Sequence, residues 1–270
     1  MSSIEQMLMV LSVKGMPNFS VPLPPAFRAT PLAHRGLHDL ATGIPENSPS
    51  AFRAAVAGGY GIELDVQLSA DGQAMVFHDD VLDRVAAGSG PVRAQTAAAL
   101  RRVPLRGGTD CSPTLPDVLA LVAGRVPVLI EIKEFLAIML PTPGLLEQAV
   151  ATALLGYSGP VAVMSFNPHC IAHMARMAPQ VARGLTTEAY DPVRNKPIPP
   201  EVCTRLRAIP DYAATHSSFI SHQATDLGRP RVAELKAAGA TILCWTIRSP
   251  DQAAKALTIA HNITFEGYRP

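Results

Sequence analysis

The stretch Gly61-Ile62-Glu63-Leu64-Asp65-Val66-Gln67-Leu68-Ser69 has the apolar, β-branched composition of a buried strand, with two acids set into it. Side chains alternate between the two faces of a strand, so Glu63 and Asp65 share one face and the aliphatic residues beside them share the other. Two adjacent buried carboxylates repel each other unless a cation neutralises them, and Mg²⁺ and Ca²⁺ prefer carboxylate oxygens. This stretch alone leaves two interpretations open: a divalent-metal site, or a half-exposed strand with one polar face.

Strand and helix patterns alternate along the rest of the chain. We expect strands to begin near residues 32, 61, 126, 161, 181, 218, 241 and 263, with a short hairpin strand over 74–77. Helices are expected over 45–57, 114–122, 145–155, 168–177, 200–207, 230–238 and 251–260. This alternation is typical of a parallel sheet covered by helices, and eight such units close into a (βα)8, or TIM, barrel. The predicted fold is therefore an α/β TIM barrel.

Two segments fall outside the regular alternation. Residues 1–31 are predicted to form a short helix and a proline-rich strap, and residues 32–270 are predicted to form the barrel. Residues 80–113 are rich in Gly, Arg and Pro, so we expect a small insertion there, after the hairpin that follows the second barrel strand. Because little sequence after the last strand remains for an eighth helix, we expect the N-terminal segment to cover that gap.

The composition excludes several classes of protein. An apolar fraction of 48% and a charged fraction of 17% over 270 residues suffice for a large core. A net charge of +1 does not indicate a nucleic-acid surface. No apolar run reaches the roughly 18 residues of a membrane span, and the start lacks the pattern of a signal peptide. The four cysteines lie far apart, which indicates reduced thiols in a cytoplasmic protein. Nothing in the sequence indicates its oligomeric state.

The active site of such a barrel lies at the C-terminal ends of its strands. The residues expected there are His34, Arg35, Glu63, Asp65, His78, Glu131, Lys133 and Trp245. The three carboxylates contribute −3, while a divalent ion, Arg35 and Lys133 contribute 2 + 1 + 1 = +4, so a phosphodiester of charge −1 would neutralise the site. Arginine binds phosphate in a bidentate manner, a metal polarises a phosphate oxygen, and histidines suit acid–base catalysis near neutral pH.

The motifs that surround these residues resemble those of the glycerophosphodiester phosphodiesterase family. The matching segments are His34-Arg35-Gly36, Pro45-Glu46-Asn47-Ser48, Ala51-Phe52, Glu63-Leu64-Asp65-Val66, Asp71-Gly72, Val76-Phe77-His78-Asp79, Leu82-Asp83-Arg84, Glu131-Ile132-Lys133, Ser165-Phe166-Asn167 and Trp245-Thr246. The resemblance covers about residues 32–250.

The resemblance implies a metal-dependent enzyme that hydrolyses small-molecule glycerophosphodiesters to sn-glycerol 3-phosphate and an alcohol. It implies one divalent metal, Mg²⁺ or Ca²⁺. The implied residues are Glu63, Asp65 and Glu131 for the metal, His34 and His78 for acid–base catalysis, and Arg35 and Lys133 for phosphate contact. We interpret Trp245 as a wall of the substrate pocket.

Three features leave alternatives open. The last strand is followed by Glu266-Gly267 where many family members have an aspartate, so contacts from that strand are in question. Glu46 is either a site residue or part of a helix start, and Asn47 is interpreted as a cap or a loop brace. The apolar run Phe135-Leu136-Ala137-Ile138-Met139-Leu140 either packs within its own loop, or holds an acyl chain, or makes a weak contact with lipid.

Two other functions are compatible with these motifs. One is a lysophospholipase D-type enzyme or a related barrel phosphodiesterase or lyase, which shares the arrangement of histidines and acids. The other is a non-catalytic barrel that binds a phosphorylated ligand. Such a barrel usually lacks one of the histidines or acids, and none is missing here.

Overall fold

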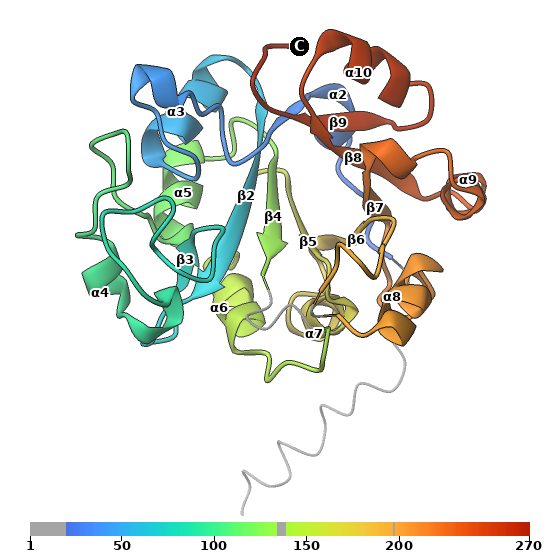
Figure 1. The fold of residues 1–270 in the computed structure, drawn as a ribbon, viewed down its shortest axis with the longest axis horizontal. Helices are drawn as coiled ribbons and strands as arrows, with labels where there is room; N and C mark the ends of the chain where they lie inside the picture. Colours follow the sequence, from blue (N-terminus) through green and yellow to red (C-terminus); the bar gives the residue numbers. More distant parts are fainter. Residues whose placement is uncertain (1–19, 134–138, 197) are drawn as a thin grey trace, which may run out of the picture.

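The computed structural model describes residues 20–133, 139–196 and 198–270, and it has the predicted barrel at its centre (Figure 1). Eight parallel strands form the barrel: β1 (Leu32–Ala33), β2 (Gly61–Leu68), β4 (Val128–Ile132), β5 (Val161–Ser165), β6 (Ala182–Thr187), β7 (Phe219–Gln223), β8 (Thr241–Ile247) and β9 (Asn262–Phe265). They are ordered β1-β9-β8-β7-β6-β5-β4-β2, and pairing of β1 with β2 closes the ring. Strand β3 (Ala74–Val76) pairs antiparallel with β2 outside the ring, as the predicted hairpin requires.

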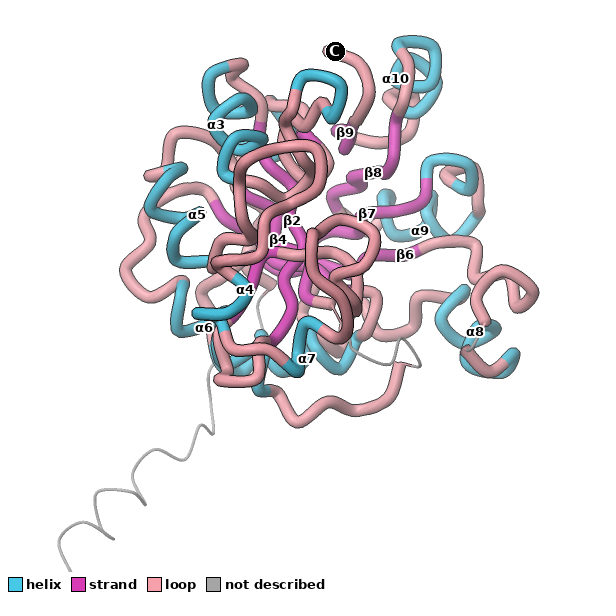
Figure 2. Tube along the Cα trace, turned by 60° about the vertical axis from the view of Figure 1, so that its left-hand side comes forward, coloured by secondary structure: helices cyan, strands magenta, loops and turns pink. Residues whose placement is uncertain are grey.

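Helices surround the strands on the outside of the barrel (Figure 2). The helices that alternate with the barrel strands are α3 (Pro49–Ala57), α5 (Leu115–Val122), α6 (Leu145–Ala153), α7 (Pro168–Met177), α8 (Pro200–Arg207), α9 (Pro230–Ala237) and α10 (Pro250–Ala256). The first of them begins later than the predicted residue 45, because the Ser48 hydroxyl accepts a hydrogen bond from the Ala51 amide and caps the helix there. Glu46 and Asn47 therefore lie in a loop. No helix in the described ranges has both the length and the apolar character that a bilayer crossing requires.

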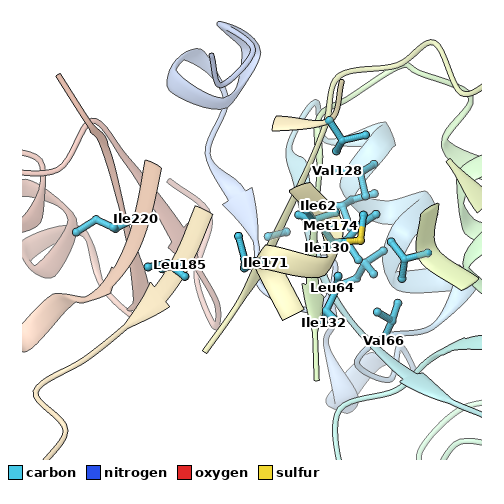
Figure 3. Packing of buried hydrophobic residues seen from close by; sticks show 14 of the residues in the cluster. Ile62, Leu64, Val66, Val128, Ile130, Ile132, Ile171, Met174, Leu185 and Ile220 are labelled. Atoms are coloured by element: carbon cyan, nitrogen blue, oxygen red, sulfur yellow. The ribbon is translucent and has the colours of Figure 1, made fainter. Parts of the chain in front are cut away.

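The main core lies between the strands and the helices (Figure 3). On β2, the buried side chains of Ile62, Leu64 and Val66 point outward and pack in the same cluster as Ile171 and Met174 of α7. Burying one such side chain stabilises the fold by about 1.5–3 kcal/mol. Because neighbouring residues of a strand face opposite ways, this packing turns Glu63 and Asp65 toward the barrel interior.

A second core fills the N-terminal end of the barrel. There Leu23 and Phe27, from the segment before β1, pack with Leu129, Phe219 and Leu243 of the strands. The side-chain amide of Asn262 donates hydrogen bonds of 2.7 Å to the carbonyls of Phe27 and Thr30, which ties helix α2 (Ala26–Ala29) to the start of β9. The described part of the strap thus closes the barrel at its base, and the helix expected over residues 1–16 lies outside the described residues.

The segment between β3 and α5 has a small core of its own. Helix α4 (Ala97–Leu100) and the short 3₁₀ helix η2 (Val92–Ala94) lie within it. Two further 3₁₀ helices lie elsewhere: η1 (Leu40–Thr42) comes before α3, and η3 (Ala224–Asp226) follows β7. Apolar residues of this segment, such as Leu82, Leu100 and Leu105, pack on Met75 and Phe77 of the hairpin. The segment is therefore anchored beside the C-terminal end of β2.

Replacing Phe27 with alanine should destabilise the barrel, because the aromatic ring is fully buried at its base. Removal of a buried phenylalanine costs about 3–5 kcal/mol. Chemical denaturation followed by circular dichroism measures the loss, and Arg28→Ala on the exposed side of the same helix is the matched control. Equal stability of the two variants would show that the base does not depend on this side chain.

Candidate active site

Three acids from two neighbouring strands meet inside the C-terminal half of the barrel. Glu63 and Asp65 point inward from β2, and Glu131 points inward from β4, where it lies directly opposite Asp65 in the strand register. All three are buried, and one carboxylate oxygen from each lies within 4.8 Å of the other two. The structure thus brings the three predicted metal ligands together, in a spacing that a single divalent ion can bridge.

Two cations border this cluster. Lys133 Nζ lies 2.9 Å from Glu131 Oε1 and 3.6 Å from Asp65 Oδ1. Arg35 Nε lies 3.4 Å from Asp65 Oδ2, and the Arg35 amide donates a 3.0 Å hydrogen bond to Glu63 Oε2. Two positive charges beside three acids leave a net negative site, which is the electrostatic setting in which a divalent cation binds.

The pKa values reflect this imbalance. Burial, together with repulsion by Asp65 and Glu131, raises the pKa of Glu63 well above its ordinary value. Burial acts in the same direction on Asp65, but the positive charges of Lys133, His78 and Arg35 outweigh it, so the pKa of Asp65 is lowered. A divalent ion among the three acids would favour the ionised form of Glu63, so the donor set fits such an ion.

His34 follows β1 and is paired with an acid from the other end of the chain. Its amide donates to the Phe265 carbonyl, and its Nδ1 lies 2.5 Å from Oε2 of Glu266. The Arg248 guanidinium contacts the second oxygen of Glu266 at 2.6 Å. The hydrogen bond with His34, aided by Arg248, lowers the pKa of Glu266 to about 2. Glu266 thus occupies the position at which the sequence left the contacts of the last strand open, and it contacts the Nδ1 atom of His34.

His78 follows β3 and is paired in the same way. Its Nδ1 lies 2.7 Å from Asp79 Oδ1, and Arg84 of the insertion contacts the other oxygen of Asp79 at 2.6 Å. Burial lowers the pKa of His78 although Asp65 acts against it. The two predicted acid–base residues therefore share one arrangement, in which a carboxylate holds Nδ1 and an arginine holds the carboxylate.

The same arginine links His78 to the phosphate-contact candidate. Arg84 also donates to Glu46 at 2.8 Å, and Glu46 accepts a 2.7 Å hydrogen bond from Arg35. An alternating chain of charges therefore runs from Arg35 through Glu46, Arg84 and Asp79 to His78. Sequence reasoning left Glu46 open and assigned no role to Asp79 or Arg84. The signal that could have found them is their presence within the quoted motifs.

The loops that carry these residues adopt uncommon backbone conformations. Arg35 and Asn47 have φ angles of 55° and 53°, in the left-handed region that most residues avoid. Asn47 donates from Nδ2 to Asp65 Oδ2 at 2.9 Å, so it braces a metal-ligand candidate, in agreement with its interpretation as a loop brace. A Cβ atom on Gly36, which has a φ of +78°, would lie 2.9 Å from Ala51 Cβ, so only glycine lets this loop pack on α3.

Trp245 lies farther round the barrel. Its indole Nε1 donates to the Ser221 carbonyl at 3.0 Å, and its ring meets Phe166 edge-on with centroids 5.5 Å apart. Phe166 lines a cavity of about 280 Å³ that also borders Glu131 and Lys133. The tryptophan therefore supports the wall of a cavity beside the acids. Of the predicted apolar run over 135–140, residues 135–138 lie outside the described residues.

With this geometry in place, comparison with known proteins identifies the family. The sequence model of the glycerophosphoryl diester phosphodiesterase family matches residues 34–261. The chain belongs to this family. Its predicted membership and its predicted barrel are thereby confirmed.

Individual relatives agree with this assignment. A glycerophosphodiester phosphodiesterase of Caldanaerobacter subterraneus is 33% identical over 57% of this chain, an alignment that spans 65% of that relative. A Bacillus subtilis protein with the provisional name glycerophosphodiester phosphodiesterase YhdW is 28% identical over 83% of this chain and 88% of its own length. Together with the family match, these relatives support the hydrolysis of glycerophosphodiesters.

Solved structures show the same fold. A phosphodiesterase of Oleispira antarctica, solved with the product sn-glycerol-3-phosphate, is 23% identical and has a TM-score of 0.71 over 89% of this chain and 94% of its own. A glycerophosphodiester phosphodiesterase of Agrobacterium tumefaciens is 25% identical, with a TM-score of 0.65 over 87% of this chain and 96% of its own.

Glu266→Gln should lower kcat for glycerophosphodiesters by about tenfold to a hundredfold, with little change in KM. The amide keeps the shape of the side chain but cannot stabilise a protonated His34, and loss of such an orienting carboxylate has effects of this size. The matched control is Glu201→Gln, which makes the same substitution at an exposed position of α8. An unchanged kcat in Glu266→Gln would show that the pair has no catalytic role.

Proposed function

We propose that this chain hydrolyses glycerophosphodiesters to sn-glycerol 3-phosphate and an alcohol, with one divalent metal, Mg²⁺ or Ca²⁺, on Glu63, Asp65 and Glu131. The observation that carries the proposal is the buried cluster of these acids within 4.8 Å, bordered by two cations and faced by two histidines. When bound, the ion would supply Lewis-acid polarisation of a non-bridging phosphate oxygen.

Arg35 and Lys133 are the proposed phosphate contacts. Burial acts to lower the pKa of Lys133, but Glu131 and Asp65 raise it above its ordinary value, so its ammonium keeps its proton. Asp65, Glu46 and Glu63 likewise outweigh burial and hold the pKa of Arg35 high. Both groups therefore stay positively charged and can bind the phosphate and stabilise the charge that develops on it.

His34 and His78 are the proposed acid–base pair. Each ring has its Nδ1 against a carboxylate, so its Nε2 is the atom that exchanges a proton with the substrate. One histidine would take the proton of the attacking hydroxyl, and the other would give a proton to the leaving alcohol oxygen. If the substrate's own glycerol hydroxyl attacks the phosphorus, a cyclic phosphate forms before glycerol 3-phosphate. If water attacks, glycerol 3-phosphate forms without a cyclic phosphate.

The proposed setting is the reducing cytoplasm. All four cysteines are free thiols, and Cys170, Cys203 and Cys244 are buried. A net charge of +1 supports a small-molecule substrate and not a nucleic acid as the partner.

Glu63→Gln should abolish turnover, because the amide removes a charged metal ligand while it keeps the shape of the side chain. The same loss is expected when an excess of chelator removes metal from the unmodified protein. A coupled assay for glycerol 3-phosphate with glycerophosphocholine measures both effects, and Glu234→Gln on the exposed surface is the matched control. Full activity after metal loss has been verified by elemental analysis would refute the mechanism.

His34→Ala and His78→Ala should each lower kcat by about a hundredfold to ten thousandfold, the range of general acid–base catalysis. The double variant should lose less than the product of the two single effects, because the residues act on one proton-transfer sequence. His216→Ala, away from the described cluster, serves as the control. Activity that survives in both single variants would assign the proton transfers elsewhere.

A further inference from the structure

Arg84, in the insertion between β3 and α5, binds two carboxylates of the candidate site at once. Its Nε and Nη2 atoms donate hydrogen bonds of 2.6 and 2.8 Å to Oδ2 and Oδ1 of Asp79. Its Nη1 and Nη2 atoms donate hydrogen bonds of 2.9 and 2.8 Å to Oε2 and Oε1 of Glu46. Each carboxylate is therefore held at both oxygens, in a planar geometry that a guanidinium provides and an ammonium does not.

Each of these carboxylates shares one oxygen with a proposed active-site residue. Oδ1 of Asp79 also lies 2.7 Å from Nδ1 of His78, and Oε1 of Glu46 also accepts a 2.7 Å hydrogen bond from Arg35. The second oxygen of each carboxylate is bound by Arg84. Without Arg84, the hydrogen bonds in the described part of the chain would hold each carboxylate by its shared oxygen only, and its plane could rotate.

The backbone that carries Arg84 is anchored in the small core of the insertion. Leu82 and Ala86, on either side of Arg84, are each 1% exposed and pack in the same cluster as Phe77, the residue before His78. The Ala86 amide donates a 2.8 Å hydrogen bond to the Leu82 carbonyl, which closes the turn between them. The Arg84 side chain therefore extends from a fixed turn beside the segment that carries His78.

Arg84 joins two loops from different parts of the chain. Arg35 and Glu46 lie between β1 and α3, whereas His78 and Asp79 follow β3. Arg84 is 38 positions from Glu46 and 5 positions from Asp79. The four hydrogen bonds of one guanidinium therefore tie the loop of the proposed phosphate contact to the loop of a proposed acid–base residue.

The charges along this contact path alternate and stay fixed near neutral pH. Burial acts to raise the pKa of Asp79, but the hydrogen bonds with Arg84 and His78 outweigh it and lower this pKa to about 2. Burial also acts to raise the pKa of Glu46, and Arg84 and Arg35 together lower it below its ordinary value. Both acids are therefore ionised and can orient the cationic and imidazole side chains that they contact.

The exposure of Arg84 separates a role in positioning from a role in stability. The side chain is 50% exposed, and exposed ion pairs contribute little to the free energy of unfolding. The geometry of the two carboxylates, by contrast, depends on the bidentate contacts. Loss of Arg84 is therefore expected to change the placement of active-site groups more than the stability of the barrel.

We propose that Arg84 is a positioning residue for the hydrolysis, and that it holds the His78 ring and the Arg35 guanidinium in the relative placement that the phosphodiester requires. Arg84 acts through Asp79 and Glu46 and not on the substrate itself. The insertion over residues 80–113 thereby gains a function, which is to supply this contact. This inference rests on the proposed function of the same site.

The first test is Arg84→Ala in the metal-loaded protein, assayed with glycerophosphocholine. The value of kcat should fall by about tenfold to a hundredfold, the effect of a small misplacement of catalytic groups, and KM should rise. The matched control is Arg102→Ala, which removes an exposed arginine of the same insertion, and the two variants should unfold at similar denaturant concentrations. Unchanged kcat and KM in Arg84→Ala would overturn the inference.

The second test is chemical rescue, which a purely structural role would not show. Because the Arg84 side chain is half exposed, added guanidinium ion can reach the space that Arg84→Ala vacates and bind the same carboxylates. Millimolar guanidinium chloride should restore part of the lost kcat, and equal concentrations of sodium chloride should not. Absence of rescue, or equal rescue by sodium chloride, would overturn the positioning role.

The third test separates the two branches of the contact path. Asp79→Asn should mainly lower kcat, because it weakens the hold on His78, and Glu46→Gln should mainly raise KM, because it weakens the hold on Arg35. Either substitution combined with Arg84→Ala should cost less than the product of the two single effects, because the residues act through shared contacts. Fully multiplicative losses in both double variants would overturn the inference.

The outcomes distinguish this inference from the proposed function. An unmodified, metal-loaded protein that does not turn over glycerophosphocholine would overturn the proposed function and this inference with it. An active unmodified protein whose Arg84→Ala variant keeps its kcat and KM would overturn the inference alone and leave the proposed function intact.

Discussion

The mutual repulsion of three buried carboxylates is the constraint on which the rest of the site depends. Glu63, Asp65 and Glu131 point into one space from adjacent strands, and burial makes it costly to ionise all of them. Lys133 and Arg35 offset part of that cost, and an ion would offset the remainder. The cations that compensate the acids are the same groups that we propose as phosphate contacts, so in the proposed mechanism a single charge balance underlies both metal binding and substrate binding.

The barrel makes this arrangement possible by separating two tasks onto the two faces of each strand. On β2 the outward side chains build the core with the helices, while the inward ones form the acidic cluster (Figure 3). The base of the barrel is filled by apolar residues from the strap and the strand starts. Stability is therefore concentrated at the base and around the outside, and the destabilising charges are confined to the opposite end.

The sequence allowed prediction of features that depend on local pattern. The two-residue spacing of Glu63 and Asp65, and of Glu131 and Lys133, places each pair on one face of its strand, and the regular alternation of strands and helices predicts the barrel that brings them together. Features that depend on contacts between distant segments were not predicted. Glu266 meets His34 across 232 positions, and Arg84 meets Glu46 across 38. Helix α3 starts at Pro49 because Ser48 caps it there. Pro45 also fits the start of a helix, and propensity alone did not distinguish the two positions.

The hydrogen bonds from Asn262 to the strap have a consequence for synthesis in the cell. Phe27 and Asn262 are 235 positions apart, so the strap leaves the ribosome long before its partner strand is made. At about 5–20 residues per second, this interval amounts to roughly 10–50 seconds. Throughout that time the ring of Phe27, which is fully buried in the finished barrel, lacks its complete native docking site. Closure of the ring, for which β1 needs β9, is delayed in the same way. The growing chain therefore exposes apolar surface, which favours aggregation, until β9 has been made.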